Sequence, residues 1–314
     1  MVAPVRDAFS GAVEVAVVGD FGDDELRRHA AGASIWINAR RPIDAHALAL
    51  GPDLRFLQQI GAGTDPVDRD AAAAAGITLA FNPGVNRTGV AEQTIMLMLA
   101  LLKRLALTEA ATRAGRFAPG EVLDVGIDDL ADAAVGLIGM GFVGRSIVER
   151  LVPFGPAIRY HTRRPVPEVE ARFGIQHVSL DELLRRSTIV SIHVPMSPET
   201  RHLIGAAQLA AMPRGSYLIN MGRGGQVDET ALRAAIVEGH LAGAALDVLE
   251  DELTGTNPFA DLPQVIVTPH LGGASRNSMG NVVARCVANI RRYLAGEPLE
   301  DVIDLGAETA TLSG

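Results

Sequence analysis

Cysteine, aromatic residues and clustered basic residues are scarce in this chain of 314 residues. Its single cysteine, Cys286, excludes an intrachain disulfide and is typical of a reducing compartment. The net charge of −9, with no run of more than two basic residues, argues against a nucleic-acid partner. The longest strongly apolar run, Ile95 to Leu102, is too short to cross a bilayer, and Met1 to Ser10 lack the pattern of a signal peptide. We therefore expect a cytoplasmic protein without a membrane partner.

The apolar content is high, at 48%, and the length suffices for two domains with sizeable cores. Short apolar strands alternate with amphipathic helices, which indicates α/β architecture with a parallel sheet. We expect strands at 13–18, 34–37, 55–58 and 77–80, helices at 24–30, 44–50 and 66–75, and a long buried helix at 88–113 followed by a loop at 115–123. A second βα array is expected from 133 to about 268, and a last helix at 276–295.

The most informative motif is Gly139-Met140-Gly141-Phe142-Val143-Gly144, which stands between a strand pattern at 133–138 and a helical pattern at 145–152. The first glycine suits a tight turn, the second lets the backbone approach a pyrophosphate, and the third lets the helix pack on the strand. The helix N-terminus adds free N–H groups and the positive end of its dipole. We interpret the motif as the opening of a dinucleotide-binding βαβ unit; the alternative is a purely structural glycine turn.

The second strand of this unit, at 157–161, lacks the acid that an NAD-binding unit places at its end to bind the ribose 2′-hydroxyl. Thr162 occupies that position and is followed by Arg163 and Arg164, with no carboxylate before Glu168. A 2′-phosphate needs cations, and guanidinium groups offer planar donor pairs for it. We predict a preference for NADP(H), with NAD(H) as the second cofactor. The alternative is that both arginines are solvated loop charges.

Five segments together resemble the D-isomer-specific 2-hydroxyacid dehydrogenases over nearly the whole chain. The five segments are Gly61-Ala62-Gly63-Thr64-Asp65 with Asp68, Asn82-Pro83-Gly84 with Val90-Ala91-Glu92, the glycine motif, Asn220-Met221-Gly222-Arg223-Gly224-Gly225 with Val227-Asp228-Glu229, and Ala245-Leu246-Asp247-Val248 leading through Glu252 to Thr268-Pro269-His270-Leu271-Gly272-Gly273. In character the chain is most similar to the NADP-dependent glyoxylate and hydroxypyruvate reductases of this family.

The resemblance implies two αβα domains, with a Rossmann nucleotide-binding domain at 105–282 inserted in a discontinuous, flavodoxin-like substrate-binding domain at 1–104 and 283–314. It also implies a catalytic cleft between the domains and a homodimer formed through the nucleotide-binding domain. Three features depart from the family pattern: the missing ribose acid, Leu253 in place of a proline after Glu252, and the absence of a tryptophan near Phe117. The chain ends too soon for the regulatory domain of longer members, which weakens the case for a serine-pathway phosphoglycerate dehydrogenase.

Reduction of a 2-keto acid needs a hydride, a proton, a clamp for the carboxylate and exclusion of water. We assign the proton to His270, after an apolar strand and beside two glycines, and we assign to Glu252 the orientation of its ring and stabilisation of the imidazolium. Arg223, on a glycine-rich turn, would bind the substrate carboxylate and polarise the keto oxygen. Alternatively, His270 is a structural histidine, Arg223 a surface charge, and Glu250 or Asp251 the acid; the family spacing from Asp247 favours Glu252.

Further residues are assigned to cofactor and substrate. The cofactor set is Gly139, Gly141, Phe142, Val143, Gly144, Thr162, Arg163, Arg164, His193, Val194, Pro195, Met221, Gly222, Asp247, Gly272 and Val90, in which Asp247 contacts the nicotinamide amide by family analogy. The backbone amides of Gly61, Ala62 and Gly63 would hold the substrate carboxylate with Arg223 and His270. No metal site is predicted, because the histidine spacing is unsuitable.

Substrate identity is left open between several acids. The missing ribose acid and the arginine pair favour a small 2-keto acid such as glyoxylate or hydroxypyruvate, and Arg40 or Arg41 could meet a second anionic group or lie in a solvated loop. The rivals are an aryl-pyruvate reductase, a phosphite dehydrogenase of the same fold, and a non-catalytic, NAD(P)-sensing corepressor-like protein. Formate dehydrogenase is disfavoured, because it typically carries Gln where this chain has Glu252.

Overall fold

The computed structural model describes residues 2–9, 13–19, 22–39, 41–117, 120 and 126–305. Contacts divide the chain into two compact units, of which unit 1 comprises Met1–Asn86 and Ser275–Gly314 and unit 2 comprises Arg87–Ala274. The expected boundaries were 104/105 and 282/283, whereas the contacts divide the chain at 86/87, before the helix that starts at Arg87, and at 274/275. That helix packs on the sheet and helices of unit 2, so it belongs with them.

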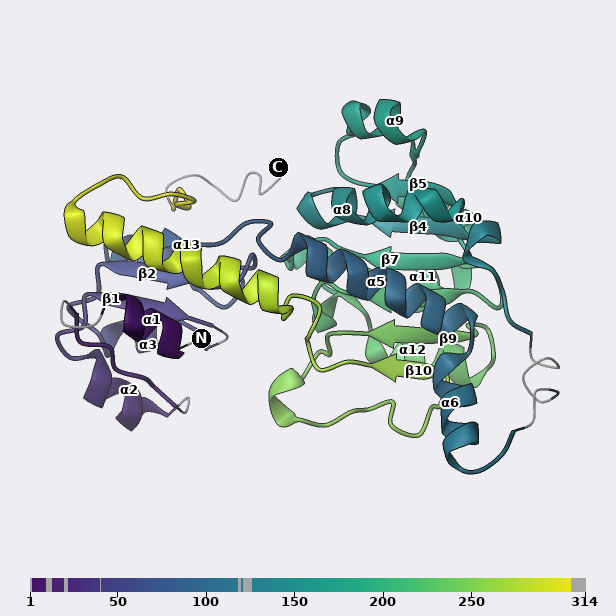
Figure 1. Ribbon diagram of the computed structural model, residues 1–314, viewed down its shortest axis with the longest axis horizontal. Helices are drawn as coiled ribbons and strands as arrows, with labels where there is room; N and C mark the ends of the chain where they lie inside the picture. The colour runs from purple at the N-terminus through teal and green to yellow at the C-terminus, as the bar shows by residue number, and fades with distance from the viewer. Residues whose placement is uncertain are drawn as a thin grey trace. The chain divides into compact units, whose positions relative to one another are not determined.

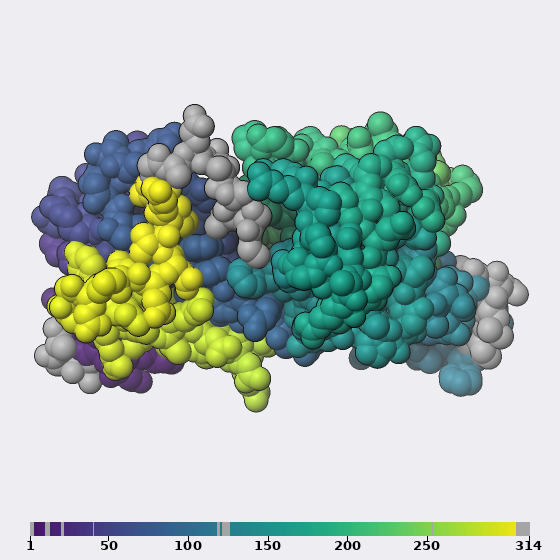
Figure 2. Space-filling model, turned by 90° about the horizontal axis from the view of Figure 1, so that it is seen from above, coloured from purple at the N-terminus to yellow at the C-terminus, as the bar shows by residue number. Residues whose placement is uncertain are grey.

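Unit 1 contains a three-stranded parallel sheet in the order β1 (Ile35–Asn38), β2 (Phe56–Gln59), β3 (Thr78–Ala80). Its helices are α1 (Val2–Ala8), α2 (Asp23–Ala30), α3 (Ala45–Ala49), α4 (Arg69–Ala74) and α13 (Arg276–Ala295). Val287 and Ile290 of α13 share a core cluster with Phe56 and Ala80. Figures 1 and 2 show this return of the chain, with the yellow C-terminal helix beside the purple and blue N-terminal elements of the same unit.

One expected strand of unit 1 is absent. Residues 14–19 form neither a strand nor a helix, and Val17 and Val18 are 41% and 36% exposed. An alternating apolar pattern forms a strand only where a neighbouring strand pairs with it, and among the described residues β1 pairs with β2 alone. The other expected strands and helices of this unit are confirmed to within a few residues, and the last helix has the bounds that were predicted.

Unit 2 contains a seven-stranded parallel sheet in the order β10-β9-β8-β7-β4-β5-β6. The strands are β4 (Ala134–Ile138), β5 (Ala157–His161), β6 (Gln176–His177), β7 (Ile189–Ile192), β8 (Tyr217–Asn220), β9 (Gly243–Leu246) and β10 (Val265–Val267). The chain proceeds outward from β4 to β6 and then returns to place β7 on the other side of β4. Ligands of doubly wound folds bind at such a switch point, at the carboxyl ends of the strands. The fold class that the sequence predicts, α/β with a Rossmann unit, is confirmed.

Helices cover both faces of this sheet. They are α5 (Arg87–Leu102), α6 (Leu105–Arg113), α8 (Phe142–Leu151), α9 (Pro167–Phe173), α10 (Leu180–Arg186), α11 (Ala206–Ala211) and α12 (Glu229–Val237), with 3-10 turns η1 (Leu130–Asp132), η2 (Val152–Phe154), η3 (Pro198–Thr200), η4 (Gly224–Gln226) and η5 (Glu252–Thr254). Figure 1 shows α5 and α8 on one face and α11 and α12 on the other. An apolar core lies on each face of the sheet, and successive residues of a strand point into opposite cores, as the pleat requires. Leu137 packs in the core under α5 and α8, and Ile138 packs in the core on the other face.

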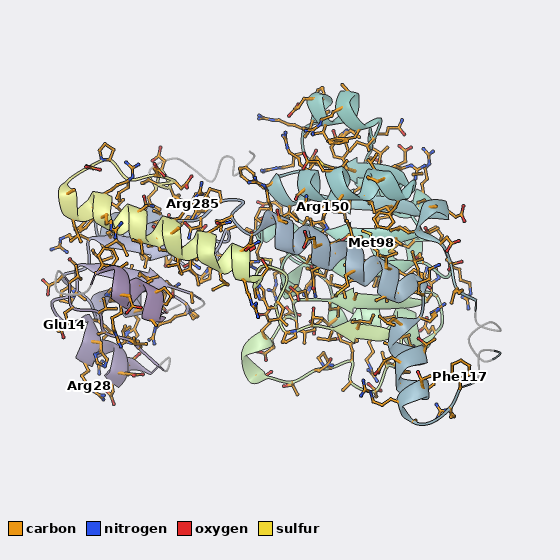
Figure 3. The ribbon with its side chains drawn as sticks, in the orientation of Figure 1. Glu14, Arg28, Met98, Phe117, Arg150 and Arg285 are labelled. Carbon is orange, nitrogen blue, oxygen red and sulfur yellow. The ribbon has the colours of Figure 1, made fainter. Side chains whose placement is uncertain are left out.

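The long helix expected at 88–113 is two helices. Arg104 adopts a left-handed conformation (φ 53°) between α5 and α6, and its guanidinium lies over the Tyr217 ring and donates to the Ala242 carbonyl at 3.2 Å. The break reorients the chain, so that α5 is mostly buried while α6 has no buried residue. Figure 3 labels Met98, which is fully buried in α5, and Phe117, which is 88% exposed beyond α6. Of the loop expected at 115–123, residues 118, 119 and 121–123 lie outside the described residues.

Candidate active site

Close contacts require two of the three glycines of the motif in the loop after β4. Gly139 has φ 107°, and a Cβ there would lie 2.7 Å from the His193 carbonyl oxygen. A Cβ on Gly144 would lie 2.4 Å from the Gly139 carbonyl oxygen, so helix and strand could not approach as they do. Gly141 precedes α8 as its N-cap and supplies no side-chain cap. The first N–H groups of α8 therefore suit a pyrophosphate, which fits the cofactor that the sequence predicts.

The loop after β5 carries Thr162, Arg163 and Arg164, and both arginines are exposed. Thr162 Oγ1 donates to the Arg164 carbonyl at 2.5 Å. The far end of the loop is held by buried Tyr160, whose hydroxyl accepts from the Val166 N–H at 2.7 Å and donates to Glu170 at 3.0 Å. Burial, above all, raises the pKa of Tyr160 to about 12, so this hydroxyl stays protonated. The loop is thus fixed at both ends while its cations face solvent.

A carboxylate that sequence reasoning missed lies near this loop. The pKa of Glu199, in η3, is lowered mainly by the hydrogen bond from Ser197 and to a smaller extent by the charge of Arg163. The residue comes from the segment after β7, not from the end of β5, where the family pattern places an acid. Only the sheet order, which places β7 and β5 on either side of β4, brings the two segments together.

The segment His193-Val194-Pro195 follows β7 at the switch point. The carbonyls of Val194 and Pro195 accept from the Gln226 side chain at 2.8 and 3.1 Å, which ties this segment to the turn that carries Arg223. His193 keeps some solvent contact as a residue, but its ring is enclosed: Nε2 lies 2.8 Å from Ser191 Oγ, and Nδ1 is buried without a hydrogen-bond partner. Burial lowers the pKa of His193 to about 3, so the ring is neutral.

Two buried amide side chains build the turn of Arg223 after β8. Asn220 accepts from the Gly222 N–H at 3.0 Å and donates to the Arg223 carbonyl at 2.8 Å. Gln226 Oε1 accepts from the Arg223 N–H at 2.9 Å, and a Cβ on Gly222 would lie 2.2 Å from that same oxygen. The position of the Arg223 backbone is therefore fixed by hydrogen bonds on both sides. Sequence reasoning identified Arg223 but not these supports.

His270 and Glu252 form the contact that the sequence predicts for the acid and its orienting carboxylate. Nδ1 of His270 lies 2.9 Å from Glu252 Oε2, and the two side chains are 32% and 28% exposed. A carboxylate only accepts, so Nδ1 carries the hydrogen and Nε2 is the atom that can exchange a proton. Of the rival acids in the sequence, Glu250 accepts instead from Arg201 at 2.8 Å.

Asp247 shapes the backbone that presents His270. Its buried carboxylate accepts from the Thr268 hydroxyl at 2.5 Å and from the N–H groups of Leu271 and Gly272 at 2.9 and 2.8 Å. His270 has φ 54°, a conformation that a non-glycine residue keeps only where its surroundings impose it. Its N–H donates to the Asp247 and Thr268 carbonyls at 2.8 and 2.9 Å. Asp247 thus organises the loop of His270, whereas its nicotinamide contact stays a prediction.

The remaining predicted residues fall into two groups. Within unit 2, Met221 and Val90 lie against Gly272, where a Cβ would be 2.7 Å from Met221 Cε and 3.6 Å from Val90 Cγ2. Phe142 and Val143 begin α8. The predicted substrate amides belong to unit 1, in the turn after β2 at Gly61, Ala62 and Gly63.

Of the two arginines considered for a second anionic group, Arg40 lies outside the described residues. Arg41 Nη2 lies 3.8 Å from Asp23 Oδ1, while its Nε and Nη1 are buried without a hydrogen-bond partner. The described residues contain no group of three or more His, Cys, Asp or Glu side chains suited to a metal ion. Nor does any described helix combine the length and hydrophobicity that a membrane span requires.

Comparison with known proteins gives concordant matches. A sequence model of the D-isomer specific 2-hydroxyacid dehydrogenase NAD binding domain matches residues 95–272. D-3-phosphoglycerate dehydrogenase of Mycobacterium tuberculosis is 33% identical over 273 residues, which are 87% of this chain and 51% of that protein, so the chain spans about half the length of this relative. Glyoxylate/hydroxypyruvate reductase B of Pectobacterium carotovorum is 36% identical over 264 residues, 83% of this chain and 82% of that protein.

A solved structure of a glyoxylate reductase from Paecilomyes thermophila is 28% identical, has a TM-score of 0.87, and covers 97% of this chain and 95% of that one. The region matched by the family model, residues 95–272, contains the glycine loop, Arg223, Glu252 and His270. The chain belongs to the D-isomer specific 2-hydroxyacid dehydrogenase family.

Proposed function

We propose that this protein is an NADPH-preferring reductase that converts a small 2-keto acid, such as glyoxylate or hydroxypyruvate, to the D-2-hydroxy acid. The observation that carries the proposal is the 2.9 Å contact between His270 Nδ1 and Glu252 Oε2. The two residues follow β10 and β9 of the sheet in which the glycine loop follows β4. Two relatives of comparable length named as glyoxylate or hydroxypyruvate reductases support the substrate class.

His270 is the proton donor in the proposed reaction. The carboxylate of Glu252 stabilises the imidazolium and fixes the ring, so that Nε2 holds a proton for the developing alkoxide oxygen. In the reverse direction the neutral ring accepts that proton. The left-handed backbone of His270, held by Asp247, sets the direction of the ring before substrate binds.

Arg223 supplies the anion clamp. Its guanidinium can pair with the substrate carboxylate and polarise the keto oxygen, and its backbone is fixed by Asn220 and Gln226. The proposal also assigns to the backbone amides of Gly61, Ala62 and Gly63 a role in holding the substrate carboxylate. A reduced nicotinamide, when bound, supplies the hydride. Arg163 and Arg164 pair with the 2′-phosphate, with Thr162 holding their loop.

The first experiment follows NADPH and NADH oxidation in parallel with glyoxylate, hydroxypyruvate, phenylpyruvate and, in the oxidative direction, phosphite. We expect turnover with the two small keto acids and a higher kcat/KM with NADPH. Phenylpyruvate as the best substrate would point to an aryl-pyruvate reductase, and phosphite oxidation alone to a phosphite dehydrogenase. No turnover with any of them would overturn the enzymatic proposal and favour the non-catalytic, cofactor-sensing protein.

His270→Ala tests the proton donor. We expect turnover to be abolished while NADPH still binds with the wild-type dissociation constant, measured by its fluorescence. Full activity of this variant contradicts the mechanism, and loss of NADPH binding means that the residue supports the cofactor site instead.

Arg163→Ala and Arg164→Ala, combined, test the cofactor preference. We expect kcat/KM for NADPH to fall by about 10- to 100-fold, because charge-assisted bonds to the phosphate are lost, while kcat/KM for NADH changes little. The matched control is Arg172→Ala, an exposed arginine of α9 that pairs with Glu149 instead. An equal loss with both cofactors contradicts the assignment.

A homodimer through unit 2 is also proposed, and an apolar groove beside α5 supports it. The groove is lined chiefly by Ile95, Met96, Leu99, Leu105 and Phe154. Met96 is 47% exposed, although α5 is otherwise mostly buried. Figure 3 labels Arg150, which reaches from α8 to α5 at the rim of this groove. Met96→Glu should convert the dimer to a monomer in light scattering; a wild-type monomer refutes the proposal.

A further inference from the structure

The loop that carries Glu252 has little apolar anchorage of its own. Val248 and Phe259 are buried, but none of the described side chains between these two residues is buried. Glu252 opens the short turn η5 in the middle of this stretch. A carboxylate that must stay 2.9 Å from a histidine ring needs a rigid support, because small displacements weaken a hydrogen bond steeply. The support must therefore come from polar or backbone contacts.

Such contacts meet at Glu250, two residues before Glu252. The Glu250 N–H donates to Glu229 Oε1 at 2.7 Å. The Glu250 carboxylate accepts from Arg201 Nη2 at 2.8 Å and lies 3.2 Å from His202 Nε2. Backbone and side chain of one residue are thus held by three residues from two other segments of unit 2. We call Arg201, His202, Glu229 and Glu250 the Glu250 clamp.

The partners of the clamp are themselves attached to the turn of Arg223. His202 has φ 47°, and its N–H donates to the Gly225 carbonyl at 2.8 Å. Glu229 opens α12, directly after that turn. A Cβ on Gly224 would lie only 1.9 Å from the Leu249 carbonyl carbon and 2.2 Å from the Glu250 nitrogen, so the two loops pack backbone against backbone. The clamp therefore joins the Glu252 loop to the Arg223 turn.

The charges of the clamp explain why Arg201 is needed. Burial, above all, raises the pKa of Glu229; the hydrogen bond from the Glu250 N–H lowers it, and the nearby charges of Glu250 and Asp251 raise it further. Three carboxylates so close together repel one another, and the guanidinium of Arg201 offsets that repulsion on Glu250. A single exposed ion pair contributes little to stability. Here the pair acts locally, because it decides whether the acidic segment stays against the Arg223 turn.

We propose that Glu250 is a positioning residue, which holds Glu252 against His270 by fastening the Glu252 loop to the turn of Arg223. The proposal rests on the proposed function, since it assigns to Glu250 an effect on the keto-acid reduction through Glu252. It does not require Glu250 to touch substrate or cofactor. It predicts that loss of the clamp slows the reaction through a displaced Glu252 carboxylate.

The test compares Glu250→Ala with Glu250→Gln, which keeps an acceptor for Arg201. We expect Glu250→Ala to lower kcat for keto-acid reduction by about tenfold or more, since misplacement of a catalytic group by about 1 Å can cost 100-fold. The upper pH limit of reduction should move to lower pH, in the same direction as for Glu252→Gln. The dissociation constant of NADPH should stay within about twofold, and Glu250→Gln should recover most of the activity.

A double variant separates positioning from a general structural effect. If Glu250 acts through Glu252, then Glu250→Ala should have no further effect on kcat in the Glu252→Gln background. The matched control is Arg185→Ala, which removes an exposed ion pair of α10, with Asp181, and should leave kcat and the pH limit unchanged. Additive losses, or a wild-type kcat and pH limit in Glu250→Ala, overturn the proposal.

Hydrogen exchange gives a result that does not depend on turnover. The amides of residues 249–255 should exchange faster in Glu250→Ala and in Arg201→Ala than in the wild type, while those of β9 stay protected. Unchanged exchange in this loop overturns the clamp even if the enzyme proves inactive on every keto acid. Faster exchange in a protein without keto-acid turnover would retain the clamp and reject only the proposed reaction.

Discussion

Protonation of His193 should destabilise the nucleotide-binding unit at mildly acidic pH. The ordinary pKa of the ring is 6.5, and burial lowers it to about 3 in the folded protein. A second ring proton would lie on Nδ1, which is buried without an acceptor, while Nε2 already faces Ser191. The unfolded chain therefore binds a proton between pH 6.5 and about 3 that the folded chain does not bind, and stability is lost as the pH falls through this window.

The magnitude follows from the two pKa values. Between pH 7.5 and pH 5.0 the free energy of unfolding should fall by about 2 kcal/mol through this residue alone. For a domain of the size of unit 2 that is a loss of about 4–8 °C in Tm. Calorimetry of the cofactor-free protein at both pH values, for the wild type and His193→Gln, isolates the effect, because the carboxylates titrate alike in both.

We expect the wild type to lose about 4–8 °C more than His193→Gln on going from pH 7.5 to pH 5.0. His29→Gln is the comparison variant, because His29 is a partly exposed histidine of α2, in contrast to the enclosed ring of His193. An equal loss in the wild type and His193→Gln would refute the reasoning and would mean that the enclosed ring reaches solvent in the folded protein.

Three further substitutions test particular contacts. Gly224→Ala places a Cβ 1.9 Å from the Leu249 carbonyl carbon, so the free energy of unfolding, measured by chemical denaturation, should fall by about 3 kcal/mol. A fall of less than about 1 kcal/mol would contradict the close packing of the two backbones. Arg223→Lys keeps the charge but not the planar donor pair, so kcat/KM for the keto acid should fall by about 10- to 100-fold with unchanged NADPH binding. Wild-type kinetics would mean that Arg223 does not bind the substrate carboxylate. Tyr160→Phe leaves the Val166 N–H and Glu170 without their shared hydroxyl, which should cost about 2 kcal/mol in the same denaturation assay, and a neutral effect would mean that water replaces it.

The features that could be predicted from the sequence are those governed by local rules. Gly139 and Gly144 follow from contacts that only a glycine allows, and the α13 bounds follow from a capping Ser275 and a terminal Gly296. The contact between His270 and Glu252 could be anticipated because family spacing encodes it, although the two residues are 18 positions apart.

The features that were missed depend on contacts between distant segments. Nothing in the pattern of Val13 to Val18 reveals that no partner strand adjoins it, and nothing around Arg104 announces a left-handed residue, which is stabilised by Tyr217 and Ala242 more than 100 positions away along the chain. Glu250 was considered only as a rival to Glu252, because its partner Arg201 lies 49 positions away. Supports of a site are harder to predict than the site itself, since their spacing carries no fixed signature.

The return of the chain to unit 1 has a consequence for synthesis on the ribosome. Unit 2 is a continuous segment, Arg87 to Ala274, and its whole core has emerged before α13 is made. The core around Phe56 and Ala80, in contrast, includes Val287 and Ile290, and the buried amide of Gln58 bonds to Asn289. The first unit to be translated is therefore the last that can complete its core, and its sheet must wait, partly uncovered, for more than 180 residues of nascent chain to pass.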